Sequence, residues 1–261
     1  MKSNYHTHTT RCHHAAGSDK DYVLSAIKGG FTDLGFSDHS PWPFKTGHVS
    51  GIRMLVKELP GYVKSIKQLA GKYQDQIHIR VGLECEYYDE YIPWLKEIIE
   101  KHELDYLIFG NHFYKTEEKY PYFGRFWDVQ ELLKLYLESS IRGMESGLYS
   151  YFAHPDLFMR RYPEFDEHCE DITIEICKQS LALDVPLEYN LAGLQYNLEA
   201  NVEEYPHSAF WEIAARYGCK TIIGNDAHNN KDLEEDKYRN LAVEFLEKIG
   251  ANVAEEIRFL R

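Results

Sequence analysis

The sequence predicts an α/β fold in which short parallel strands alternate with helices along the whole chain. Seven β-rich runs end in polar residues, and each is followed by a stretch with helical character. This alternation predicts a parallel sheet with crossover helices, either a closed barrel or an open doubly wound sheet. No GxGxxG motif follows the first run, so the main sequence evidence for a dinucleotide-binding fold is missing.

The expected elements follow one another in a regular order. Strands are expected at 3–8, 32–39, 77–86, 105–112, 149–154, 186–190 and 220–228. Helices are expected near 18–29, 52–75, 89–102, 127–146, 167–184, 206–218 and 232–249. The clearest helical periodicity is that of WDVQELLKLYLESSIRGM at 127–144. No linker rich in Pro, Gly or Ser divides the chain, so we expect a single domain over residues 1–261.

Composition and charge exclude several classes of protein. The 261 residues carry a net charge of −13, and 44% of them are hydrophobic, which is typical of a globular chain. An acidic surface repels nucleic acid and anionic lipid, so neither is an expected partner. The N-terminal MKSNYHTHTT has no apolar segment, and no apolar run approaches the ~18 residues of a membrane span. Five scattered cysteines without a CxxC motif favour reduced thiols and a cytoplasmic location.

The histidines are numerous and unevenly placed. Seven of the 13 lie at or just after the ends of predicted strands, close to carboxylates. His6 and His8 form an HxH pair, whose side chains point the same way on a strand. In a parallel barrel all the C-terminal strand ends meet at one face, so these residues would converge on one pocket. The other six are expected to be core or surface histidines: His13, His48, His78, His102, His168 and His207.

The converging side chains predict a metal site. Imidazoles and carboxylates without an obvious thiolate suit Zn, Mn or Fe(II) better than calcium or a four-cysteine structural zinc site. The number of candidate ligands exceeds what one ion needs. We therefore expect two or three ions in a catalytic cluster.

Seven motifs extend from residue 6 to residue 228. They are HTH at 6–8, His14 six residues after His8, SDH at 37–39, Glu84 on the third strand, NH at 111–112, HPD at 154–156 and NDAH at 225–228. In this combination the chain resembles the PHP (polymerase and histidinol phosphatase) superfamily. The resemblance implies a distorted (β/α) barrel of seven parallel strands with outer helices and a metal site at the C-terminal strand ends.

Within that superfamily the chain is most similar to the histidinol-phosphate phosphatase branch. The similar stretches are HTHTTRCHHA, LGFSDHSP, GLECEY, HPDLFMRRY and EYNLAGL. Two positions depart from the branch: Asn225 stands where a small residue is more common, and Gln195 where a basic residue is usual. These departures concern substrate contacts and leave the metal set unchanged.

The resemblance implies three divalent ions (Zn, Mn or Fe). His13 competes with His14 for one ligand position, and the spacing from His8 in the family pattern favours His14. Glu86 and Asp156 are expected to orient imidazoles. The first ion would be held by His6, His8, Glu84 and Asp226, the second by Glu84 as a bridge with His112 and His154, and the third by His14, His39 and His228.

The implied activity is the metal-dependent hydrolysis of L-histidinol phosphate to L-histidinol and phosphate, a step of histidine biosynthesis. A hydroxide shared by the ions would be the nucleophile. Asp38 and His228 are candidates for helping the leaving group, with an orienting role for Asp38 as an equal alternative. Arg160 is a candidate for binding the phosphate, with a solvated loop arginine as the alternative.

Two other functions fit parts of the sequence. A PHP phosphodiesterase or nucleotide phosphatase would share the metal set, but the acidic balance and the lack of a basic groove weaken this interpretation for long nucleic acids. A non-catalytic metal-binding module would not need every ligand position filled. A small phosphate monoester is therefore the expected partner, and the aromatic residues that suit its organic end are Phe113, Tyr114, Tyr189 and Tyr196.

Overall fold

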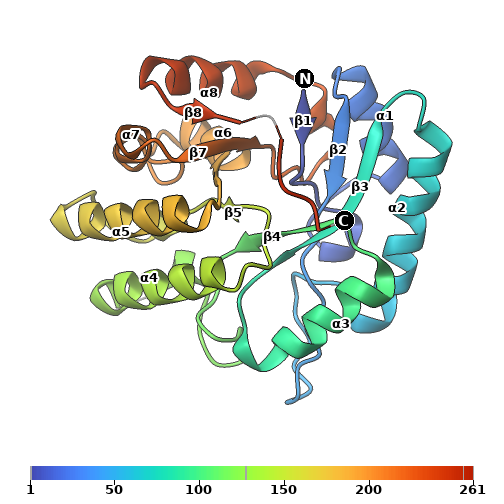
Figure 1. Cartoon of the computed structure of the whole chain (residues 1–261), viewed down its shortest axis with the longest axis horizontal. Helices are drawn as coiled ribbons and strands as arrows, with labels where there is room; N and C mark the ends of the chain where they lie inside the picture. Colours follow the sequence, from blue (N-terminus) through green and yellow to red (C-terminus); the bar gives the residue numbers. More distant parts are fainter. Residues whose placement is uncertain (1, 127, 255, 261) are drawn as a thin grey trace.

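The computed structural model describes residues 2–126, 128–254 and 256–260. Over these residues, eight parallel strands form one sheet in which each strand pairs with the next along the chain (Figure 1). The predicted α/β barrel of parallel strands is confirmed, with eight strands instead of seven. The strands are β1 (Ser3–Asn4), β2 (Asp33–Phe36), β3 (His78–Cys85), β4 (Tyr106–Gly110), β5 (Phe152–Ala153), β6 (Leu187–Asn190), β7 (Lys220–Gly224) and β8 (Asn252–Val253).

The α-helices lie on the outer side of the curved sheet (Figure 1). Helix α2 begins later than predicted, at Leu59, and α6 follows β6 directly where no helix was expected. The predicted helix at 127–146 is confirmed from Val129, and Trp127 lies outside the described residues. The helices are α1 (Asp19–Lys28), α2 (Leu59–Tyr73), α3 (Ile92–His102), α4 (Val129–Glu145), α5 (Glu167–Leu183), α6 (Leu191–Ala200), α7 (Ser208–Tyr217) and α8 (Lys237–Lys248).

Alternation along the strands divides the core into two clusters. On β4, Tyr106 and Ile108 belong to a small cluster inside the barrel, whereas Leu107 and Phe109 pack outward against the helices. The Tyr106 hydroxyl donates to the Tyr5 carbonyl at 2.8 Å across the interior. Residues 256–260 cross the starts of the strands (Figure 1), where the Leu260 N–H donates to the Asp105 carbonyl at 2.8 Å. They cover this end of the barrel, and the site opens at the other end.

The barrel is distorted because its two ends close differently. At the C-terminal strand ends, the chain after β1 pairs with the chain after β7 through a bridge between Thr7 and Ala227. The His8 N–H donates to the Ala227 carbonyl at 3.0 Å, and the Ala227 N–H donates to the His6 carbonyl at 3.1 Å. At the opposite end, β8 pairs with the start of β7. The chain after the first strand thus pairs with the chain after the seventh beside the clustered histidines.

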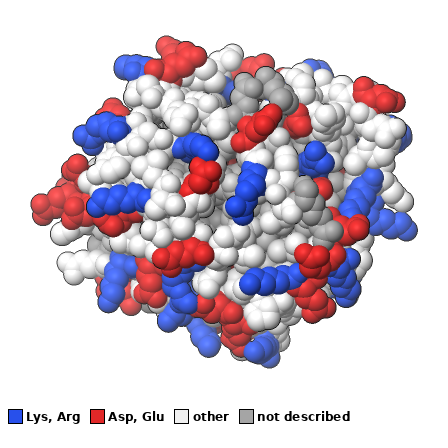
Figure 2. Space-filling view, viewed as in Figure 1, with Lys and Arg blue, Asp and Glu red and all other residues white. Residues whose placement is uncertain are grey.

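The surface mixes both signs of charge. On the face drawn in Figure 2, Lys and Arg side chains stand beside Asp and Glu side chains and form no continuous stripe. Among the described residues, no helix has both the length and the apolar character needed to cross a bilayer.

Candidate metal centre

Three of the predicted strands extend too far, because the chain leaves the ladder before it reaches the site. β1 ends at Asn4, β5 at Ala153 and β7 at Gly224, each just short of a candidate ligand. His154 and Asp226 then adopt left-handed backbone conformations, with φ of 34° and 50°. These turns direct the side chains into the barrel mouth, which an extended strand would not do.

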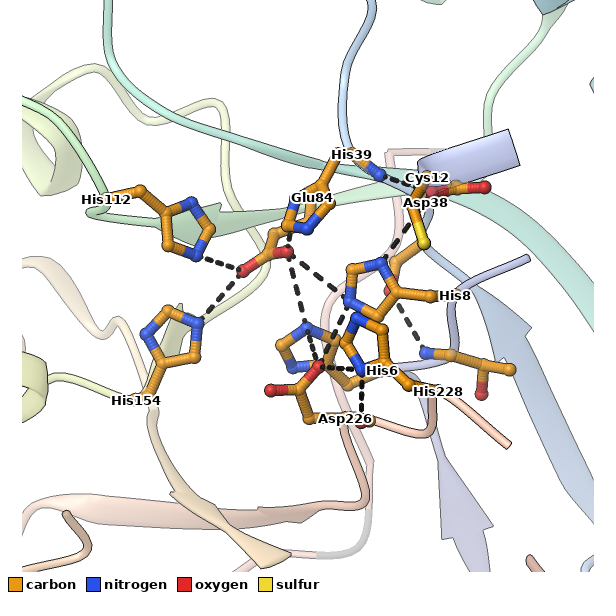
Figure 3. Close-up of polar contacts among 12 residues, drawn as sticks. His6, His8, Cys12, Asp38, His39, Glu84, His112, His154, Asp226 and His228 are labelled. Atoms are coloured by element: carbon orange, nitrogen blue, oxygen red, sulfur yellow. Dashed lines mark hydrogen bonds and ion pairs between the residues drawn. The ribbon is translucent and has the colours of Figure 1, made fainter. Parts of the chain in front are cut away.

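Four donor atoms from three chain segments meet at the centre of the site (Figure 3). His6 Nε2 lies 3.5 Å from Glu84 Oε2 and 3.3 Å from Asp226 Oδ1. His8 Nε2 lies 3.5 Å and 3.0 Å from the same two oxygens. The structure thus brings together the four residues expected at the first ion.

The second expected group lies on the other oxygen of Glu84. His112 Nε2 is 3.3 Å and His154 Nε2 is 3.0 Å from Glu84 Oε1 (Figure 3). As expected, Glu86 orients an imidazole: its Oε1 accepts from His112 Nδ1 at 2.8 Å. The Arg53 guanidinium and His112 overcome the opposing effect of burial and hold the pKa of Glu86 at about 2, so this acceptor is ionised.

The third expected group is arranged less tightly. The His14 ring stacks on the His228 ring with centroids 4.6 Å apart, and the His39 centroid lies 5.6 Å from that of His14. The potential ligand atoms of these histidines belong to two groups, in each of which the atoms lie within 4.8 Å of one another. One group contains His8, His39 and His228, and the other contains Cys12, His14 and His228. Cys12 was not predicted as a candidate ligand, because its sulfur is brought to the histidines by the turn that follows Thr10–Cys12.

Of the two competing histidines, His14 is the one at the centre. His13 Nε2 contacts the Arg53 carbonyl at 3.1 Å, away from the cluster. His14 Nδ1 contacts the Cys12 carbonyl at 2.7 Å, which leaves Nε2 for a ligand.

Charge balance in the cluster depends on carboxylates that neutralise imidazolium groups. Burial alone would lower the pKa of His6, but the surrounding carboxylates, Glu188 foremost, hold it well above its usual value. Burial would likewise raise the pKa of Glu84, yet the imidazoles, led by that of His112, hold it well below its usual value. Burial lowers the pKa of His228 to about 3. Divalent cations would compete for the places that these protons take.

The donor atoms fit a metal ion. His6 Nε2, His8 Nε2, Glu84 Oε2 and Asp226 Oδ1 are buried, and none makes a hydrogen bond with another described group. Unsatisfied buried polar atoms are costly and need a partner. In a tetrahedral zinc site with bonds of about 2.1 Å, neighbouring donor atoms lie roughly 3.4 Å apart. The observed separations of 3.0–3.5 Å match that spacing.

A cavity of about 720 Å³ opens over the cluster. Arg160 lines it, with its guanidinium 5.2 Å from the centre of the Tyr196 ring and its Nε 3.7 Å from Glu204. Arg161 turns away and donates to the Phe126 carbonyl at 2.9 Å.

The aromatic lining differs in part from the expectation. Phe113 and Tyr196 line the cavity. Tyr114 instead donates its hydroxyl to Glu138, and Tyr189 packs against Trp211 on the outer side of the sheet. Tyr189 follows an inward residue on β6 and therefore points outward. The polar and aromatic cavity residues that were not predicted include Arg125, Tyr122 and Tyr205.

Asp38 and Asp156 are buried carboxylates that are not among the expected ligands. Asp38 is fully buried, approaches His8 Nδ1 at 3.7 Å and accepts from the Thr9 hydroxyl. Asp156 was expected to orient an imidazole, and this expectation is wrong: it accepts from Trp211 Nε1 at 3.0 Å and from the His207 backbone N–H at 2.8 Å. The turn after His154 directs it behind the cavity wall.

The fold and this cluster define a class of α/β barrel proteins with a histidine- and carboxylate-rich centre at the C-terminal strand ends. The sequence matches the PHP domain family over residues 4–188, and the chain belongs to this family. The resemblance indicated by the motifs is thereby confirmed.

Three proteins are similar to this chain in sequence or in structure. The chain is 27% identical over 232 residues to a probable histidinol-phosphatase of Deinococcus radiodurans, covering 85% of each protein. A putative histidinol phosphatase of Listeria monocytogenes shares the fold with a TM-score of 0.76 and 21% identity, covering 88% of this chain and 97% of that one. A histidinol phosphate phosphatase of Lactococcus lactis, solved with zinc, L-histidinol and phosphate, has a TM-score of 0.74 and 22% identity, covering 97% of this chain and 95% of that one.

The central position of Glu84 gives a first prediction. Because its two oxygens face two donor groups, Glu84→Gln is expected to weaken divalent-metal binding at both by at least ~10-fold. Calorimetric titration of the metal-free protein measures this, with the exposed Glu212→Gln on α7 as the control. Wild-type affinity in Glu84→Gln would remove Glu84 from the centre.

Proposed function

We propose that this protein is a metal-dependent phosphatase that hydrolyses L-histidinol phosphate to L-histidinol and phosphate. The observation that carries the proposal is that the donor cluster and the Arg160 side chain line one cavity. A phosphate ester bound there would have cations on two sides and aromatic rings around its organic end. The names of the Deinococcus and Lactococcus relatives support the same substrate.

The donor sets suit three divalent ions, of Zn, Mn or Fe. Ions held there would supply an activated water and neutralise the charge of the phosphoryl group as its ester bond breaks. The zinc of the Lactococcus relative supports a divalent metal. We assign His6, His8, Glu84 and Asp226 to the first ion, Glu84, His112 and His154 to the second, and His14, His39 and His228 to the third.

The remaining polar groups would bind and orient. Arg160 would donate two guanidinium N–H groups to phosphate oxygens, since its planar fork matches that geometry. His228 Nδ1 contacts the Asp226 carbonyl at 2.9 Å, which leaves Nε2 for an ion and favours the role of a ligand. The burial of Asp38 behind His8 favours the orienting role over contact with the leaving group.

A cytoplasmic location belongs to the same proposal. The five cysteines are free and buried, which suits a reducing compartment. Histidine biosynthesis would supply the substrate.

Substrate preference tests the proposal directly. We expect kcat/KM for L-histidinol phosphate to exceed that for p-nitrophenyl phosphate at least ~100-fold, roughly 2.7 kcal/mol of transition-state binding. Phosphate release from the two esters, from a nucleotide and from a diester measures it. An equal rate on all monoesters would leave an unselective phosphatase, and a preference for diesters would replace the proposal.

Metal removal tests the chemistry. Dialysis against a chelator should abolish turnover, and added Zn, Mn or Fe should restore it, because no other group in the proposal activates the water. Elemental analysis confirms removal, and a chelator already saturated with metal serves as the control. Full turnover by protein shown to be metal-free would refute metal catalysis.

Arg160 gives a prediction separate from the metals. Arg160→Ala should lower kcat/KM by about 2–4 kcal/mol, since charge-assisted hydrogen bonds to phosphate in a partly desolvated site are strong. Arg160→Lys should recover only part, because a point charge lacks the two-pronged geometry. Metal content should not change.

Arg161→Ala is the matched control, because the adjacent guanidinium is bound to the Phe126 carbonyl. Its kcat/KM should stay within about threefold of wild type, because the loss of this partly buried hydrogen bond affects stability by only about 1 kcal/mol and removes no contact with the cavity. If Arg161→Ala were the damaging change, or Arg160→Ala a silent one, the phosphate contact would be assigned to the wrong residue.

A further inference from the structure

The carboxylate of Glu188 lies beneath the donor cluster and has no part in the function proposed above. It is on β6, points into the barrel and is fully buried. The neighbouring strand makes room for it: a Cβ at Gly224 would lie 1.8 Å from Glu188 Oε1. A glycine is therefore required at 224 for the carboxylate to occupy this place.

The two oxygens of Glu188 reach different donor groups. Oε1 accepts from His6 Nδ1 at 2.8 Å. Oε2 accepts from the His154 backbone N–H at 3.2 Å and from Asn190 Nδ2 at 3.1 Å. Asn190 Nδ2 also donates to Asp226 Oδ2 at 3.2 Å. One carboxylate thus joins His6 and Asp226 of the first group to His154 of the second.

Two of the residues joined in this way have strained backbones. His154 and Asp226 lie in the left-handed region, which costs a non-glycine residue on the order of 1–3 kcal/mol and persists only where the surroundings hold it. Glu188 accepts the N–H of the strained His154 directly. Through Asn190 it also fixes the side chain of the strained Asp226. One hydrogen bond therefore holds the backbone of His154, and the other holds the side chain of Asp226.

We propose that Glu188 is a positioning residue that holds the first and second donor groups in register, so that their two ions bind as a unit. The proposal rests on the metal site of the proposed function. Without Glu188 the His6 ring loses the acceptor that fixes its orientation, and His154 loses the acceptor that fixes its backbone. Groups that orient ligands in this way typically contribute 10–100-fold to metal affinity.

The test uses the full-length protein and two substitutions at one position. Glu188→Gln removes the charge with little change in shape. Glu188→Asp keeps the charge but is one methylene shorter, so it cannot span both partners, and it serves where Glu188→Gln does not fold. Asp156→Asn is the matched control, since Asp156 is equally buried but bonds to Trp211 and the His207 backbone.

Two measurements read the effect without activity. Calorimetric titration of the metal-free proteins with Zn²⁺ gives the affinity of each ion, and the visible spectrum of Co²⁺-loaded protein reports the coordination geometry. We expect both Glu188 variants to bind the first and second ions about 10–100-fold more weakly with an altered Co²⁺ spectrum, and Asp156→Asn to match wild type within twofold.

Each other result has a definite meaning. Weakening of one ion alone would overturn the joint binding, and unchanged binding would overturn the positioning role. Wild-type affinity and a wild-type Co²⁺ spectrum in Glu188→Asp would show that the negative charge alone is sufficient. That result would overturn the geometric role of Glu188. If the wild-type protein bound no ion, the proposed metal site itself would be refuted. That result differs from a failure of the positioning role of Glu188, which requires a wild type that binds metal.

Discussion

The centre depends on a buried carboxylate, Glu84, and on the cost of leaving its charge without partners. The side chain is 1% exposed, and imidazoles of the described residues surround both of its oxygens. A buried charge stripped of its partners destabilises a fold by several kcal/mol, so the imidazoles and the ions they would bind are part of what keeps Glu84 ionised. The next strand leaves space for it, since a Cβ at Gly110 would lie 2.3 Å from Glu84 Oε1. The imidazoles come from four strand ends: His6, His8, His39, His112 and His154.

The sequence could predict the fold and the donor residues because both follow from short-range pattern. Alternating β-rich and helical segments define a parallel barrel, and such a barrel brings every C-terminal strand end to one face. Because His6, Glu84 and Asp226 were placed at strand ends, their side chains could be predicted to lie close together. β8 escaped prediction because Asn252 and Val253 are exposed and carry no apolar pattern. α6 escaped because it starts directly after β6, capped by Asn190, without an intervening loop.

Features that depend on side-chain direction could not be predicted in the same way. Asp156 follows His154 by two residues, which suggested a shared pocket, but the left-handed turn at His154 directs it toward Trp211. The same kind of turn explains why β5 ends before its expected ligand. Glu188 stood in a strand-end motif, yet its partners lie 34 and 182 residues away in the chain and no local pattern connects them. Such contacts become visible only when the barrel closes.

The most direct measurement of the central claim is anomalous X-ray diffraction from crystals of the protein grown with zinc or manganese. This experiment locates each ion without reference to activity. We expect one peak among His6, His8, Glu84 and Asp226, a second beside His112 and His154, and a third beside His14, His39 and His228. Catalytically active crystals with no anomalous peak at the first two positions would contradict the assignment of this cluster as the metal centre.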